Sequence, residues 1–191
     1  MNLPNKLTIL RILMAPAFLA ALLLDFPQHY LVALILFCAA SLTDLVDGKY
    51  ARKHNMITDF GKFLDPLADK MLTTAAFLGF IKLEIGHGIV FITFIVLIRE
   101  FLITSLRLVS AGKGKVIAAN IWGKAKTVSQ MIGIIVAIVV EYIISLGVLN
   151  DEACSTLGYA VSGFLWISAG LTIISGVLYL IENLEFVDYK K

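Results

Sequence analysis

Six long apolar runs divide the chain and limit how it can fold. A helix needs about 20 mostly apolar residues to cross a bilayer. Only 16% of the 191 residues are charged, whereas a soluble domain has about 25%. The pattern predicts an all-α, polytopic membrane protein with six transmembrane helices, which form one integral-membrane domain over residues 1–191. The runs are Leu7–Leu24, Tyr30–Tyr50, Leu67–Ile81, Gly88–Leu108, Trp122–Leu149 and Leu157–Ile181.

The third run is too short to span a bilayer by itself, so its helix is expected to begin earlier, near Thr58 or Asp59. Asp65 and Asp69 would then lie in its first turns. Pro66 leaves this boundary open, because proline is tolerated at the first helical position and is costly deeper in a helix.

The basic residues indicate the orientation of the spans. All of the 16 lysine and arginine residues except Lys82 lie at or near the connections that share a side with the two termini. Short loops rich in lysine and arginine stay in the cytoplasm. Both termini and the turn between the second and third spans are therefore predicted to be cytoplasmic.

The first run has a second interpretation, as a secretory signal peptide. Lys6 and Arg11 precede or enter an apolar stretch that contains the sequence "APA". Because Arg11 lies inside the run, and because the run continues well past "APA", an uncleaved first span is favoured.

Four aspartates surround the turn between the second and third spans. Asp44 and Asp47 are three residues apart, and Asp65 and Asp69 are four apart, so each pair shares one face of a helix. Two carboxylates about 6 Å apart repel by roughly 3 kcal/mol at an effective dielectric constant near 20. If the two helices pack together, the acids need a divalent cation. The alternative is that the four aspartates are interfacial charges that extend to water without binding a cation. Aspartate has a short side chain, which suits that role poorly.

The full spacing is D-x2-D-G-x2-A-R-x8-G-x3-D-x3-D, from Asp44 to Asp69. This resembles the signature of the CDP-alcohol phosphotransferases, which are membrane enzymes of phospholipid synthesis. The resemblance implies a site for two Mg²⁺ or Mn²⁺ ions, with Asp44, Asp47 and Asp65 at one ion and Asp44, Asp65 and Asp69 at the other. It further implies that Asp69 is the catalytic base.

The same resemblance assigns residues around the motif to the CDP-lipid. Gly48 would let the nucleotide approach the backbone closely. Arg52 would contact its phosphates, since a planar guanidinium suits phosphate oxygens. Thr58 would add a hydroxyl contact.

Three further stretches resemble the members of this family that form phosphatidylglycerophosphate. They are "NLPNKLTILRI", "DPLADKML" and the run from Ile98 to Met131. The implied reaction transfers a phosphatidyl group from CDP-diacylglycerol to sn-glycerol 3-phosphate and releases CMP. The implied protein is a homodimer in the bacterial cytoplasmic membrane, among membrane lipids, with its active site facing the cytoplasm and no nucleic-acid partner.

An acceptor that carries a phosphate needs basic residues beyond Arg52. The candidates lie in or near the fourth and fifth spans and are Arg99, Arg107, Lys124 and Lys126. Arg99 has a structural alternative, an ion pair with Glu100. The loop residues Lys113 and Lys115 have another, contact with anionic lipid headgroups.

Other functions predict other patterns. A cation transporter would place acids near the middle of the membrane, on broken helices, whereas these aspartates cluster at one end. A scaffold without chemistry leaves the four aspartates unexplained. Within the family, cardiolipin, phosphatidylserine and phosphatidylinositol-phosphate synthases are the alternatives.

Overall fold

The computed structural model contains six helices and describes the backbone of residues 3–54, 59–112 and 121–183. Side chains are described for residues 5–44, 64, 67, 68, 70–110 and 121–183. Within this part of the chain no strand occurs, which confirms the all-α prediction. The helices are α1 (Leu3–Leu23), α2 (His29–His54), α3 (Asp59–Lys82), α4 (Ile89–Gly112), α5 (Ile121–Ser145) and α6 (Asp151–Asn183).

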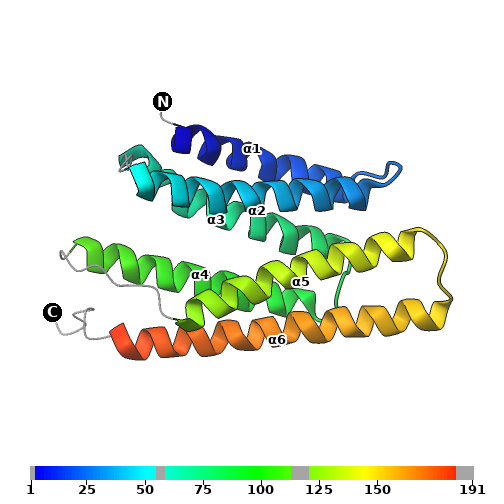
Figure 1. Cartoon of the computed structure of the whole chain (residues 1–191). Coiled ribbons are helices and arrows are strands. Elements are labelled where there is room, and N and C mark those ends of the chain that lie inside the picture. Colours follow the sequence, from blue (N-terminus) through cyan, green and yellow to red (C-terminus); the bar gives the residue numbers. More distant parts are fainter. Residues whose placement is uncertain (1–2, 55–58, 113–120, 184–191) are drawn as a thin grey trace.

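The helices alternate in direction and form two groups of three, α1–α3 and α4–α6 (Figure 1). Helix α1 packs against both α2 and α3, while α6 packs against both α4 and α5. Contacts of α5 with α2 and of α4 with α3 join the two groups. The start of α1, the end of α2, the start of α3 and the end of α6 lie at the same end of the bundle (Figure 1). Lys6, near the start of α1, and Lys53, near the end of α2, belong to this end, whereas Lys82 lies at the opposite one.

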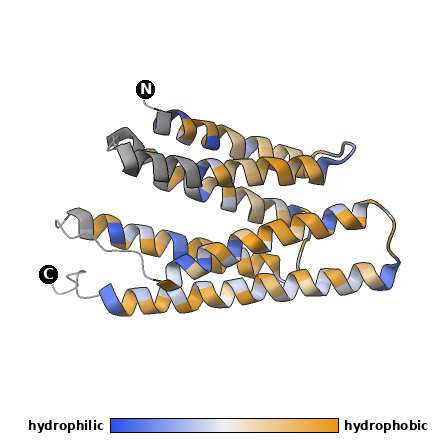
Figure 2. Ribbon diagram, viewed as in Figure 1, coloured by the Kyte–Doolittle hydropathy of each residue, from blue (hydrophilic) through white to orange (hydrophobic). Residues whose placement is uncertain are grey.

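Aromatic residues fill the centre of the first group. Phe18 of α1 and Phe37 of α2 are fully buried, with ring centroids 5.5 Å apart. Phe77 and Phe80 of α3 are also buried. The outer faces are apolar as well, as Figure 2 shows, and α4 exposes Phe91 among other large side chains. An apolar exterior of this extent suits a bilayer, because lipid tails do not penalise exposed hydrocarbon.

Four of the six predicted spans are long and apolar enough to cross a membrane. Helix α2 is apolar over His29–Asp44 and carries charged residues beyond that point. Helix α3 begins at Asp59, as expected, and its charged residues lie mainly in its first half. The two helices that bear the aspartates are therefore the ones with a polar half. The four apolar helices are α1 over Asn5–Leu23, α4 over Ile89–Ser110, α5 and α6.

The turn between α3 and α4 is fixed against α6. The backbone N–H of His87 donates a hydrogen bond to Ser162 Oγ at 2.9 Å. Trp166 Nε1 donates to the carbonyl oxygen of His87 at 3.0 Å. Gly88 has a φ of 71°, a conformation that suits glycine, and a Cβ there would lie 3.2 Å from the Trp166 ring. These contacts hold the two helix groups together at the end far from the aspartates.

Candidate functional site

The aspartate pairs lie on two consecutive helices. Asp44 and Asp47 belong to α2, and Asp65 and Asp69 belong to α3. The end of α2 and the start of α3 meet at one end of the bundle (Figure 1). Asp44 is the one aspartate of the four whose side chain is described. The side chains of Asp47, Arg52, Asp65 and Asp69 lie outside the described part, as do the surroundings of Gly48 and all of Thr58.

Asp44 is bound by an arginine of the first helix. Arg11 Nη1 lies 2.7 Å from Asp44 Oδ1. The Arg11 side chain is only 2% exposed, while that of Asp44 is 38% exposed. Removing an arginine from water is costly unless a carboxylate compensates it. The pair therefore fixes α1 against α2 at the first residue of the acidic motif.

Other polar side chains accompany Arg11 on α1. Asn5 and Thr8 are buried and lie six and three residues before it, respectively, so all three follow one face of the helix. Arg11 was interpreted from the sequence only as part of the first span. A charged residue inside an apolar run indicates either a function or a buried partner of opposite charge. Arg11 was therefore the sequence signal from which its contact with the acidic motif could have been predicted.

The donor chemistry of this region fits a hard divalent cation. Aspartate oxygens are ligands that Mg²⁺ and Mn²⁺ accept. Arg11 holds Asp44 through Oδ1, and the carboxylate is still half-exposed. Among the described side chains there is no group of three or more potential ligands, since three of the four aspartates are not included in that search.

A second charged cluster joins α3, α4 and α5. Its centre is the carboxylate of Glu100, which is 19% exposed. Arg99 Nη1 donates to Glu100 Oε1 at 3.1 Å, and Lys126 Nζ donates to the same oxygen. Lys70 Nζ lies 3.9 Å from Oε2. We call these four residues, Lys70, Arg99, Glu100 and Lys126, the Glu100 cluster.

Lys70 also ties α3 to the backbone of α4. Its Nζ donates to the carbonyl oxygen of Glu100 at 3.3 Å and to Thr104 Oγ1. Thr104 Oγ1 in turn donates to the Glu100 carbonyl oxygen at 2.7 Å. Lys70 follows Asp69 directly in sequence, so this contact holds α3 at the acidic motif. Neither Lys70 nor the central position of Glu100 was predicted from the sequence.

The four candidates for binding an acceptor phosphate fall into two groups. Arg99 and Lys126 come together in the Glu100 cluster, and the alternative expected for Arg99, an ion pair with Glu100, is present. Arg107 instead donates from Nε to Tyr179 Oη at 2.9 Å, with its guanidinium 5.3 Å from the ring centroid. Lys124 is exposed. Lys113 and Lys115 lie outside the described residues.

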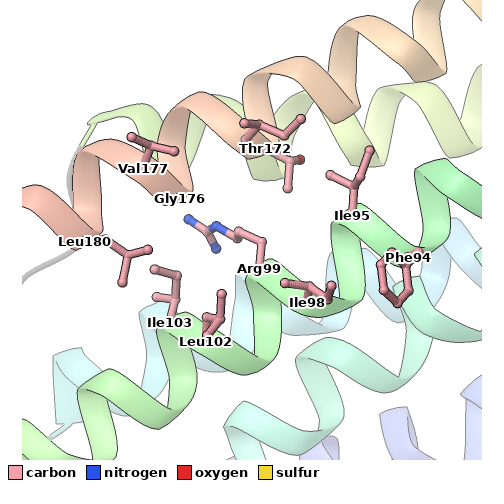
Figure 3. A pocket seen from close by; sticks show the side chains of 11 residues that line it. Phe94, Ile95, Ile98, Arg99, Leu102, Ile103, Thr172, Gly176, Val177 and Leu180 are labelled. Carbon is pink, nitrogen blue, oxygen red and sulfur yellow. The ribbon is translucent and has the colours of Figure 1, made fainter.

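Arg99 belongs to the Glu100 cluster and also lines an apolar groove between α4 and α6. Its Nη2 donates to Ser175 Oγ of α6 at 2.8 Å. Figure 3 shows its side chain reaching from α4 toward Gly176, between apolar residues of both helices. The groove has a volume of about 260 Å³. A Cβ at Gly176 would lie 3.1 Å from Arg99 Cγ, so glycine leaves room for this arginine.

The helical membrane architecture and the acidic motif agree with comparisons to known proteins. A family model described as CDP-alcohol phosphatidyltransferase matches residues 1–177, and the chain belongs to this family. This confirms the resemblance seen in the sequence.

Three relatives that bear the name CDP-diacylglycerol–glycerol-3-phosphate 3-phosphatidyltransferase are similar to this chain over most of its length. The protein of that name from Bacillus subtilis (strain 168) is 38% identical, over 96% of each chain. The one from Rickettsia bellii (strain RML369-C) is 35% identical, over 93% of each. The one from Pseudomonas fluorescens is 33% identical, over 94% of this chain and 89% of its own.

The Arg11–Asp44 pair yields a direct test. Arg11→Met should lower both the thermal midpoint in detergent and the enzymatic activity, because it leaves Asp44 without its charged donor. A hydrogen bond to a charged group contributes about 1.5–3 kcal/mol. Arg11→Lys should lie between wild type and Arg11→Met, since lysine keeps the charge and loses the planar fork. Equal thermal midpoints and activities for all three proteins would show that the pair contributes nothing.

Proposed function

We propose that the chain transfers a phosphatidyl group from CDP-diacylglycerol to sn-glycerol 3-phosphate, giving phosphatidylglycerophosphate and CMP. The observation that carries this proposal is the similarity to the three relatives of that name over 93% or more of this chain. The acidic motif from Asp44 to Asp69 supports it, because its residue types suit the cleavage of a pyrophosphate.

The chemistry assigns a role to each aspartate. The acceptor hydroxyl oxygen forms a bond to the phosphorus of the phosphatidyl group, and the bond from that phosphorus to the oxygen of CMP breaks. Asp69 takes the hydroxyl proton as the general base. Asp44, Asp47 and Asp65 would hold one Mg²⁺ or Mn²⁺ ion, and Asp44, Asp65 and Asp69 a second. When bound, the two ions supply positive charge to the pyrophosphate oxygens.

Binding of the two substrates is divided between two groups of residues. Gly48, Arg52 and Thr58 bind the CDP portion of the donor. The phosphate of the acceptor binds basic residues of α4 and α5. This is supported by the fact that two of these residues, Arg99 and Lys126, both contact Glu100. These basic residues are Arg99, Arg107, Lys124 and Lys126.

The proposed setting is the bacterial cytoplasmic membrane. All six helices cross it, and the end that carries the aspartates faces the cytoplasm. The asymmetric distribution of lysine and arginine supports this orientation. The functional unit is a homodimer.

An acceptor panel tests the reaction. Purified protein is given CDP-diacylglycerol and, in separate assays, glycerol 3-phosphate, serine, inositol phosphate or phosphatidylglycerol, and lipid products are identified by mass. Phosphatidylglycerophosphate should form only with glycerol 3-phosphate, in the presence of Mg²⁺ or Mn²⁺, and excess chelator should abolish it. If the protein turned over another acceptor at a higher rate, its activity would be that of a different member of the family. Full activity in chelator would contradict the metal site.

The base assignment predicts a separation of binding from turnover. Asp69→Asn should bind CDP-diacylglycerol nearly as wild type does and should lose at least about 100-fold in kcat, the scale of general-base catalysis. The amide retains the shape of the carboxylate and accepts no proton. Asp47→Asn is the matched comparison and should weaken donor binding as well. Near-normal kcat in Asp69→Asn would show that another group is the base.

The orientation can be tested by cysteine labelling. With Cys38 and Cys154 replaced by serine, a cysteine is placed at His54 in one protein and at Asp151, which is exposed at the opposite end, in another. An impermeant maleimide added to intact cells should label position 151 and should reach position 54 only after permeabilisation. The reverse pattern would invert the proposed topology.

A further inference from the structure

Two largely enclosed cations share one carboxylate oxygen in the Glu100 cluster. Lys126 is 4% exposed and Arg99 is 13% exposed, and both donate to Glu100 Oε1. Among the described side chains, one carboxylate therefore faces positive charges from α4 and α5, with Lys70 of α3 as a third. An uncompensated charge in a low-dielectric interior is costly, so this arrangement favours the binding of an additional anion.

The same two side chains retain hydrogen-bond donors. An ammonium group has three donors, and Lys126 uses one of them on Glu100. The Nε of Arg99 is buried and makes no hydrogen bond with any described residue. These donors belong to charged groups, which form strong hydrogen bonds with phosphate oxygens.

The hydrogen bonds to Glu100 fix the positions of these donors. A lysine side chain has four rotatable bonds, so without a partner its ammonium group can occupy many positions. Glu100 binds Lys126 from one helix and Arg99 from its own, and its backbone carbonyl receives Lys70 from a third. The carboxylate thus sets the distance between cations that the sequence places on separate spans.

We propose that Glu100 is a positioning residue for the acceptor: it holds Lys126 and Arg99 together so that both contact the acceptor's phosphate. This inference rests on the proposed function and adds a residue and a mode of action to it. Glu100 acts through Lys126 and Arg99 and does not itself contact the acceptor, because its carboxylate would repel the phosphate. It therefore contributes to acceptor recognition only while its cationic partners are present.

A double-mutant cycle tests this dependence. The proteins are wild type, Glu100→Gln, Lys126→Met and the double variant, and KM is measured for each substrate. Each single variant should raise the acceptor KM by about ten- to a hundredfold, the scale of one lost contact to a charged group, with little change in the donor KM. The double variant should raise the acceptor KM by clearly less than the product of the two single increases, because Glu100 has then lost one of the two groups that it positions.

Two further variants separate positioning from a general effect on folding. Glu100→Asp keeps the charge and withdraws the carboxylate by one methylene, so it should raise the acceptor KM while its thermal midpoint stays close to that of wild type. It also keeps the test decisive if Glu100→Gln does not fold. Glu141→Gln removes the carboxylate of another spanning residue, 15 positions after Lys126 on α5 and thus about 22 Å away. It should leave both KM values unchanged.

The outcomes distinguish this inference from the proposed function. If wild type turns over no phosphorylated acceptor, the proposed function fails, and this inference fails with it. If wild type uses glycerol 3-phosphate but the two single effects multiply in the double variant, Glu100 does not act through Lys126. Equal increases in the KM of both substrates, or a lower thermal midpoint with unchanged KM values, would reduce Glu100 to a structural role.

Discussion

The ion pair between Arg11 and Asp44 shows the constraint on which this bundle depends. A charged side chain that enters a helical membrane protein must find an opposite charge, because neither lipid nor the apolar core solvates it. Arg11 is almost completely buried on α1 and meets the first aspartate of the motif on α2. The first aspartate of the motif is thus part of the packing between helices as well as a proposed metal ligand, and α1 cannot shift along α2 without separating the pair.

The same constraint explains how charge is divided among the six helices. Four of them are apolar along almost their whole length and can face lipid over that length. Helices α2 and α3 combine an apolar half with a charged half, and both charged halves lie at one end of the bundle. At the opposite end, the α3–α4 turn is hydrogen-bonded to α6 through Ser162 and Trp166. The contacts described at that turn are neutral hydrogen bonds, whereas an ion pair, Arg11–Asp44, joins two helices at the end that carries the aspartates.

The sequence predicted the helices because their signal is local. Hydropathy separates the six runs, and the start of α3 at Asp59 follows from the length that a spanning helix needs. The acidic motif was equally visible, since it lies within 26 consecutive residues. The Glu100 cluster could not be predicted in this way. Its members come from three helices, and the spacing of residues along the chain does not show how these helices are rotated relative to one another. Lys124 and Lys126 illustrate this: two residues apart, they lie on nearly opposite faces of α5, and only Lys126 is buried.

The position of Lys70 connects the two charged regions. It follows Asp69 on α3, and its ammonium group binds the backbone of α4 at Glu100 and the hydroxyl of Thr104. Any displacement of α3 that moved the acidic motif along the bundle would have to break these contacts. Conversely, a phosphate bound by Lys126 and Arg99 would be held by the same cluster to which Lys70 belongs, since Lys70 Nζ lies 3.9 Å from Glu100 Oε2. The residue that anchors the segment bearing the proposed base therefore belongs to the cluster that would receive the acceptor, so both can be held in register by one network of charges.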